Sequence, residues 1–157
     1  IVAMGEACRI AGEEMTAEQI RIRTLRDRLW RAWSALGGVS LNGHPDGNAA
    51  GILNLLFAGI AAEALLTAIP EIAVATGSAC TSADNEPSHV LRAMGCDEVR
   101  ARGAVRFSLG RFTTAEEIEY AAQRVSAAVN RLRELSPLWE LRQRGLDQRV
   151  VNWAALP

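Results

Sequence analysis

Hydrophobic positions near the N-terminus follow the spacing of an amphipathic helix. Apolar residues recur at steps of three or four up to a stop at Gly37-Gly38. These apolar positions are Ile22, Leu25, Leu29, Trp33 and Leu36. Residues 1–14 are also rich in helix-forming residues, and Thr16 with Gln19 matches a capping box. The pattern therefore predicts either two helices that meet at Thr16 or one helix that runs through it.

Shorter apolar runs, separated by Gly, Pro and Asn, predict a small sheet and further helices. Strands are expected at residues 39–43, 51–57, 72–75 and 104–109, and short helices at 61–69 and 87–94. A capping box at Thr114 predicts a helix that stops before Pro137. Beyond it we expect a loosely structured tail anchored by Trp139 and Trp153. This order predicts an α+β fold, a small sheet with helices packed on one side.

Length, charge and composition exclude several classes of protein. The 157 residues are enough for one domain, and no apolar run is long enough to cross a membrane. A net charge of -1 gives no general attraction to nucleic acid. Arginines gather on one helix face, and a solvated face balanced by nearby carboxylates is favoured over a nucleic-acid patch. These arginines are Arg21, Arg23, Arg26, Arg28 and Arg31.

All 17 basic residues of the chain are arginine. Without a lysine, the chain cannot supply a Schiff-base lysine or a phosphate-loop lysine. The chain has three cysteines, a small and odd number that argues against a disulfide framework. A reducing, cytoplasmic location is therefore predicted. Because the chain begins at Ile1, we also expect it to be cut from a longer product.

The candidate chemistry centres on Cys80, which follows an apolar segment and lies in a run of small residues before a polar loop. An accessible thiolate is reactive and a buried thiol packs; the pattern leaves both open. His89 and Cys96 lack the close pairing of zinc ligands, so no metal site is predicted, and no cysteine-protease signature surrounds the surface residue His44. Cys8 is predicted to be a packed helix residue and Cys96 a half-buried thiol.

Three segments carry a resemblance to a known family. Residues 77–82, 86–93 and 105–114 resemble cysteine desulfurases, most closely the housekeeping type that feeds iron–sulfur cluster assembly. The likeness extends over essentially the whole chain and covers only the C-terminal part of the family. It implies the small C-terminal domain of fold type I pyridoxal-phosphate enzymes, preceded by a long linking helix.

On this resemblance, residues 1–15 end the large cofactor domain and start the linking helix. Residues 16–136 form the small domain with a mobile cysteine loop at 76–90, and 137–157 form a tail that contacts partners. Two departures are that residues 58–63 lack the family's Glu-Gly pair and that the tail lacks its terminal histidine.

The resemblance also implies an activity, in which L-cysteine is converted to L-alanine and the sulfur stays on Cys80 as a persulfide. Arg106 is expected to hold the substrate carboxylate. The pyridoxal phosphate would be bound by the absent large domain, with no cofactor-binding residue in this chain. An iron–sulfur scaffold or other sulfur acceptor is the expected partner, and a homodimer the expected assembly. A stand-alone persulfide relay without cofactor chemistry, and a purely structural fragment, are the alternatives.

Overall fold

The computed structural model describes residues 1–76, 88–97, 100–101 and 103–145. Its centre is an antiparallel sheet of order β1-β2-β4-β3. The strands are β1 (Val39–Leu41), β2 (Ile52–Phe57), β3 (Ala75–Thr76) and β4 (Ala104–Ser108). The helices are α1 (Val2–Ser34), α2 (Ala62–Ala68), α3 (His89–Ala93), α5 (Ala115–Glu134) and α6 (Pro137–Gln143). The predicted α+β class is confirmed.

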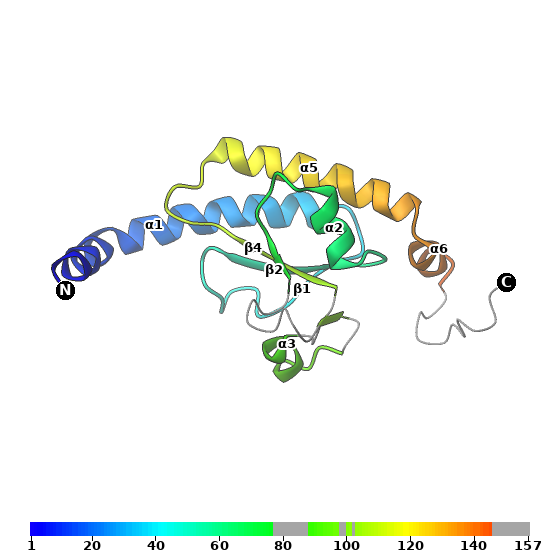
Figure 1. Ribbon diagram of the computed structural model, residues 1–157, viewed down its shortest axis with the longest axis horizontal. Coiled ribbons are helices and arrows are strands. Elements are labelled where there is room, and N and C mark those ends of the chain that lie inside the picture. The colour runs from blue at the N-terminus through cyan, green and yellow to red at the C-terminus, as the bar shows by residue number, and fades with distance from the viewer. Residues whose placement is uncertain (77–87, 98–99, 102, 146–157) are drawn as a thin grey trace.

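Helices α1, α2 and α5 cover one face of the sheet (Figure 1). Alternate residues of β2 and β4 point into this layer because side chains of a strand alternate between its faces. The buried set on these strands is Leu53, Leu55, Phe57, Val105 and Phe107. The fully buried Trp33 of α1 meets them, with its ring centroid 4.5 Å from that of Phe107. The core therefore lies between the sheet and the long helices.

Helix α1 is one continuous helix that passes through Thr16 without a break. Its first half has no buried residue, whereas Ile22, Leu25 and Leu29 line the core as their spacing predicts. The prediction of a fully solvated arginine face is wrong at Arg26, which is only 6% exposed. Arg26 donates hydrogen bonds to Asp27 and Asn48, which explains why a guanidinium is tolerated there.

Helix α5 begins at the predicted capping box. The Thr114 hydroxyl accepts a hydrogen bond from the backbone N–H of Glu117 at 3.2 Å, and the Glu117 carboxylate accepts one from the backbone N–H of Thr114 at 2.9 Å. These bonds satisfy donors that a helix start leaves without partners. The buried face of α5 includes Ile118, Val125 and Val129. The sequence therefore defines both the start of α5 and the side it buries.

The expectation of a loosely structured chain beyond α5 is wrong for residues 137–143, which form α6. Pro137 occupies the first turn, where its missing N–H costs nothing, and the Ser136 hydroxyl caps the helix by accepting from the Trp139 N–H at 3.2 Å. Trp139 is an anchor, as predicted. Trp153 lies outside the described residues.

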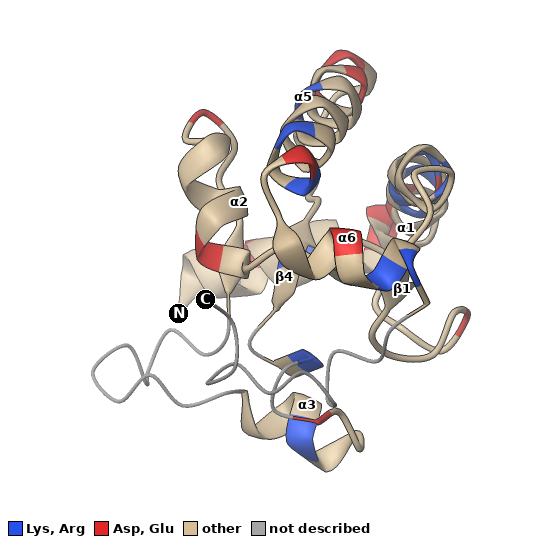
Figure 2. Cartoon of the chain, turned by 90° about the vertical axis from the view of Figure 1, so that its right-hand side faces the viewer, with Lys and Arg blue, Asp and Glu red and all other residues tan. Residues whose placement is uncertain are grey.

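Two further elements differ from expectation. The strand predicted at residues 72–75 begins only at Ala75, because Ile72 and Val74 pack against the core without pairing to a neighbouring strand. Helix α3 lies across the sheet from α1, α2 and α5 (Figure 2). Its Leu91 packs with Ala101 and with Ala104 of β4. The second face of the sheet is thus partly covered and partly open.

Candidate functional site

Arg106 lies on β4, on the sheet face opposite α1 and α5. Its neighbours Val105 and Phe107 are buried in the core, and the alternation of the strand turns Arg106 outward, where it is exposed. In register it stands opposite Asn54 of β2 and Ala75 of β3. Within the described ranges, no carboxylate lies within ion-pair distance of its guanidinium. Among these residues, Arg106 is therefore not held by an ion pair.

A row of polar side chains crosses the sheet at the level of Arg106. The Asn42 backbone N–H donates to the Asn54 carbonyl at 2.9 Å, and the Asn42 side-chain amide donates to Asn54 Oδ1 at 2.8 Å. The guanidinium of Arg100 donates to Asn42 Oδ1 at 2.8 Å. The sequence analysis missed this row. Its signal was present, because asparagine is depleted in strands and two of them fall at the predicted strands.

Cys80, the residue on which the predicted chemistry depends, lies outside the described residues. Thr76 of β3 is the last described residue before it. The pairing of β3 with β4 is nevertheless defined, because Ala75 pairs with Arg106 and Thr76 with Val105. The strand that leads toward Cys80 therefore runs beside the strand that carries Arg106.

Two other cysteines are described. Cys8 is exposed on the first half of α1, so the prediction that it is a packed residue is wrong. The reason is that this half of α1 contacts no other element through a buried side chain. Cys96 is half-buried, as predicted, with its sulfur 4.0 Å from Asn42 Oδ1.

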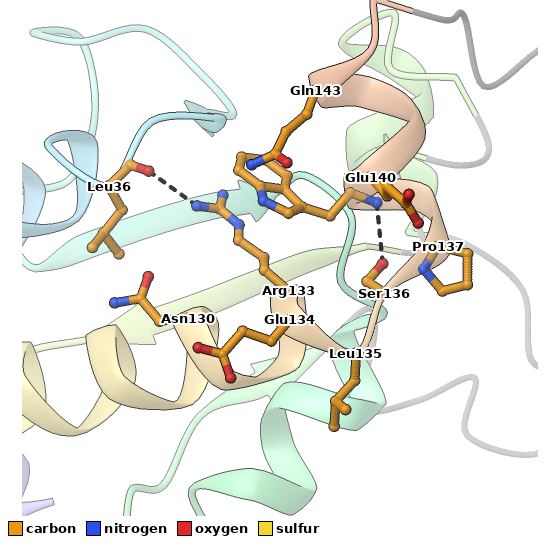
Figure 3. Close-up of a pocket in the computed structure, with 10 residues that line it drawn as sticks. Leu36, Asn130, Arg133, Glu134, Leu135, Ser136, Pro137, Glu140 and Gln143 are labelled. Carbon is orange, nitrogen blue, oxygen red and sulfur yellow. Dashed lines mark hydrogen bonds between the residues drawn. The ribbon is translucent and has the colours of Figure 1, made fainter.

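A separate pocket of about 630 Å³ lies where α5 meets α6 (Figure 3). Arg133, only 5% exposed, donates to the carbonyl of Leu36 at 3.0 Å and to that of Gly37 at 2.9 Å. Its guanidinium carbon lies 3.8 Å from the centroid of the Trp139 ring. Burial, and secondarily Arg142, lowers the pKa of Arg133. The residue ties the end of α1 to α6, so this pocket is a structural junction.

The model of the class-V aminotransferase family matches residues 1–121. The chain belongs to that family.

The chain is similar to proteins named cysteine desulfurase and to solved NifS-like structures. It is 53% identical over 154 residues to cysteine desulfurase IscS of Pectobacterium carotovorum and 51% identical to that of Klebsiella pneumoniae. Each match covers 98% of this chain and 38% of the relative. A solved NifS-like protein, 27% identical, matches 80% of this chain and 32% of its own, with a TM-score of 0.68. A NifS-like protein from Rickettsia africae, 21% identical, shares the fold with a TM-score of 0.69 and covers 80% of this chain and 33% of its own.

In this class-V aminotransferase chain, α1 fixes the loop that follows β4. The Arg21 guanidinium donates to the carbonyls of Thr113 at 2.8 Å and of Arg111 at 2.5 Å. Arg111 in turn pairs with Glu18 at 2.9 Å and Glu14 at 3.3 Å. The hydrogen bond from Arg111 is the main reason that the pKa of Glu18 is lowered. Arg111 is therefore a structural residue that ties β4 to α1.

Other kinds of site find no support in the part of the chain that the structure describes. There, no three His, Cys, Asp or Glu side chains gather as metal ligands would. None of the helices defined there is both long and apolar enough to span a membrane.

Proposed function

We propose that this chain is the C-terminal, sulfur-carrying part of a pyridoxal-phosphate-dependent cysteine desulfurase. The observation that carries the proposal is the 53% identity to a protein named cysteine desulfurase IscS, over 98% of this chain. Identity at this level along the whole chain supports a shared activity and not merely a shared fold. Because the chain spans 38% of the length of that relative, the activity belongs to the complete protein.

The position of Arg106 supports its role as the residue that binds the substrate carboxylate. A guanidinium presents a planar fork of donors that matches the two oxygens of a carboxylate. Arg106 is exposed on the open sheet face, and no described carboxylate occupies it. The donors of Arg106 are therefore available to a small anionic substrate.

The role of Cys80 is supported by chain connectivity. Three residues separate it from Thr76, so the four Cα–Cα steps between them keep its Cα within about 14 Å of the Thr76 Cα. Thr76 pairs with Val105, the residue before Arg106. This connection to the strand beside Arg106 supports the proposal that the Cys80 thiolate acts on a substrate whose carboxylate Arg106 holds.

The reaction balances without a further reactant. The Cys80 thiol and the thiol of L-cysteine become an enzyme persulfide, as the substrate carbon–sulfur bond breaks and a sulfur–sulfur bond forms. The β-carbon takes up a proton and leaves as the methyl group of L-alanine. Pyridoxal phosphate, when bound, supplies the electron sink for the amino-acid carbons. Because this chain has no lysine, it cannot supply the covalent anchor of that cofactor. Its residues therefore serve the substrate and the sulfur.

Residues 1–15 would end the cofactor domain, and the exposed Val2, Met4 and Met15 support a neighbouring domain along this half of α1. Residues 16–136, with the loop at 76–90, would form the small domain. The tail at 137–157, which starts with α6, would contact an iron–sulfur scaffold or another sulfur acceptor. A homodimer and a cytoplasmic location stay predictions.

The alternative is a stand-alone relay that accepts a persulfide on Cys80 from another protein. The absence of lysine favours it, since such a relay needs no cofactor. It predicts that this chain alone gains sulfur from a persulfide donor and that no larger protein containing it makes alanine from cysteine.

The test is Cys80→Ser in the complete protein loaded with pyridoxal phosphate. We expect the variant to keep the cofactor absorbance and to lose both alanine formation and sulfur transfer to an acceptor, because the hydroxyl is far less nucleophilic than a thiolate. Cys8→Ser is the matched control, since Cys8 is an exposed thiol on α1, and it should leave both rates unchanged. Undiminished sulfur transfer by Cys80→Ser would refute the proposal.

A further inference from the structure

Asn54 stands directly opposite Arg106 in the register of β2 and β4. We propose that its side-chain amide is a second donor to the carboxylate that Arg106 binds. The inference rests on the proposed function, because it assigns a further residue to the same substrate. Side chains directly opposite each other on antiparallel strands have Cβ atoms about 5 Å apart. That separation lets one carboxylate reach both donors.

The orientation of the Asn54 amide follows from its partners. Arginine carries only donors, so the atom of Asn42 that meets Arg100 must be the acceptor Oδ1. The NH2 group of Asn42 therefore faces Asn54, and the atom of Asn54 that receives it at 2.8 Å must be Oδ1. This leaves the NH2 group of Asn54 on the side away from Asn42, which is the side on which Arg106 lies. Arg100 thus determines, through two amides, that Asn54 presents a donor.

Hydrogen bonds hold the residues that support Asn54 in this row. Asn42 is 7% exposed, and its backbone N–H is held by the Asn54 carbonyl at 2.9 Å. Arg100 is held in turn, since its second donor reaches the carbonyl of Leu41 at 3.2 Å. A donor fixed in this way loses little rotational freedom on binding, which is where preorganised sites gain affinity.

The NH2 group of Asn54 meets no acceptor among the residues that the structure describes. Beside it lies a guanidinium that also has only donors. Two adjacent donors with one positive charge match the charge and the acceptor geometry of a carboxylate. The row therefore selects an amino-acid substrate over an amine that lacks the carboxylate.

The test is Asn54→Asp in the complete, cofactor-loaded protein. The variant keeps the shape of the side chain and the oxygen that accepts from Asn42, so any purely structural role of residue 54 is retained. It replaces the donor with an anion beside Arg106. We expect the KM for L-cysteine to rise by about tenfold or more, with kcat within about threefold of wild type, since a charge-assisted hydrogen bond of this kind is lost and replaced by repulsion. Binding of cysteamine, which has no carboxylate, should not weaken.

Two further variants complete the experiment. Asn54→Ala removes the donor without adding charge and should give a smaller rise in the KM for L-cysteine. Ser40→Ala is the matched control, because Ser40 lies on the same sheet face, opposite Leu56 and outside the row, and its KM should equal that of wild type. A wild-type protein without desulfurase activity would refute the proposed function. An active wild type whose Asn54→Asp variant keeps its KM, or weakens cysteamine equally, would refute this inference alone.

Discussion

Replacing Arg133 by leucine removes a side chain that joins the end of α1 to α6. Arg133 donates to the carbonyls of Leu36 and Gly37 and more weakly to those of Gly38 at 3.3 Å and Ala58 at 3.4 Å. Leucine fills much of the same volume and contributes no donor. The change therefore tests whether this buried charge stabilises the fold through its hydrogen bonds or merely through its bulk.

The magnitude follows from the contacts. The two short hydrogen bonds come from a charged donor and contribute about 1.5 kcal/mol each, and stacking on the Trp139 ring adds about 1 kcal/mol. Burial opposes this, since it lowers the pKa of Arg133 and leucine carries no such cost. We therefore expect the free energy of unfolding to fall by about 3 kcal/mol.

The assay is urea unfolding followed by far-ultraviolet circular dichroism. Arg131→Leu is the matched control, because Arg131 lies on the same helix and is exposed; it should change stability by less than about 0.5 kcal/mol. Arg133→Lys should fall between the two, since an ammonium keeps the charge and lacks the planar fork. Equal unfolding midpoints for Arg133→Leu and Arg131→Leu would refute the reasoning.

Two other predictions concern stability. Gly59→Ala should destabilise the fold by about 2 kcal/mol, because Gly59 has φ +82° and an added Cβ would lie 2.9 Å from the Trp139 Cβ, whereas Gly12→Ala, inside α1 with open space around it, should stabilise by about 0.7 kcal/mol; thermal melts that rank the two the other way would contradict this. A backbone hydrogen bond and the hydrogen bond from Arg124 lower the pKa of Glu71 from 4.5. The ionised Glu71 carboxylate therefore stabilises the fold above pH 4.5, and this stabilisation is lost as the pH falls through the lowered pKa. On acidification from roughly pH 5 to pH 3, the melting temperature of Glu71→Gln should therefore fall less than that of wild type. Parallel plots of melting temperature against pH would refute the assignment.

Helix positions were predictable where one face of a helix is buried. The spacing of Leu25, Leu29 and Trp33 and the capping box at Thr114 are local signals, and the structure follows both. The α6 helix escaped prediction because its stability comes from Trp139 packing over Arg133, a contact between residues six apart that no periodicity reports. The capping signal Ser136-Pro137 was nevertheless in the sequence.

Burial and strand pairing diverged at other positions. Ile72 and Val74 are apolar because they pack on the core, and the strand itself starts after them. Arg26 lies among solvated arginines in sequence, yet tertiary contact with Asn48 buries it. The sequence pointed to Arg106 through a family likeness, whereas its neighbour Asn54 emerged only once strand register was known.

The most direct test of the central claim is to follow sulfur from the substrate. The complete protein, loaded with pyridoxal phosphate, would be incubated with L-cysteine labelled in its sulfur atom and digested without reductant. We predict that the peptide containing Cys80 gains one labelled sulfur atom, in a yield that matches the alanine formed in a single turnover. Label on the peptides of Cys8 or Cys96, or alanine formed with no label on Cys80, would contradict the account.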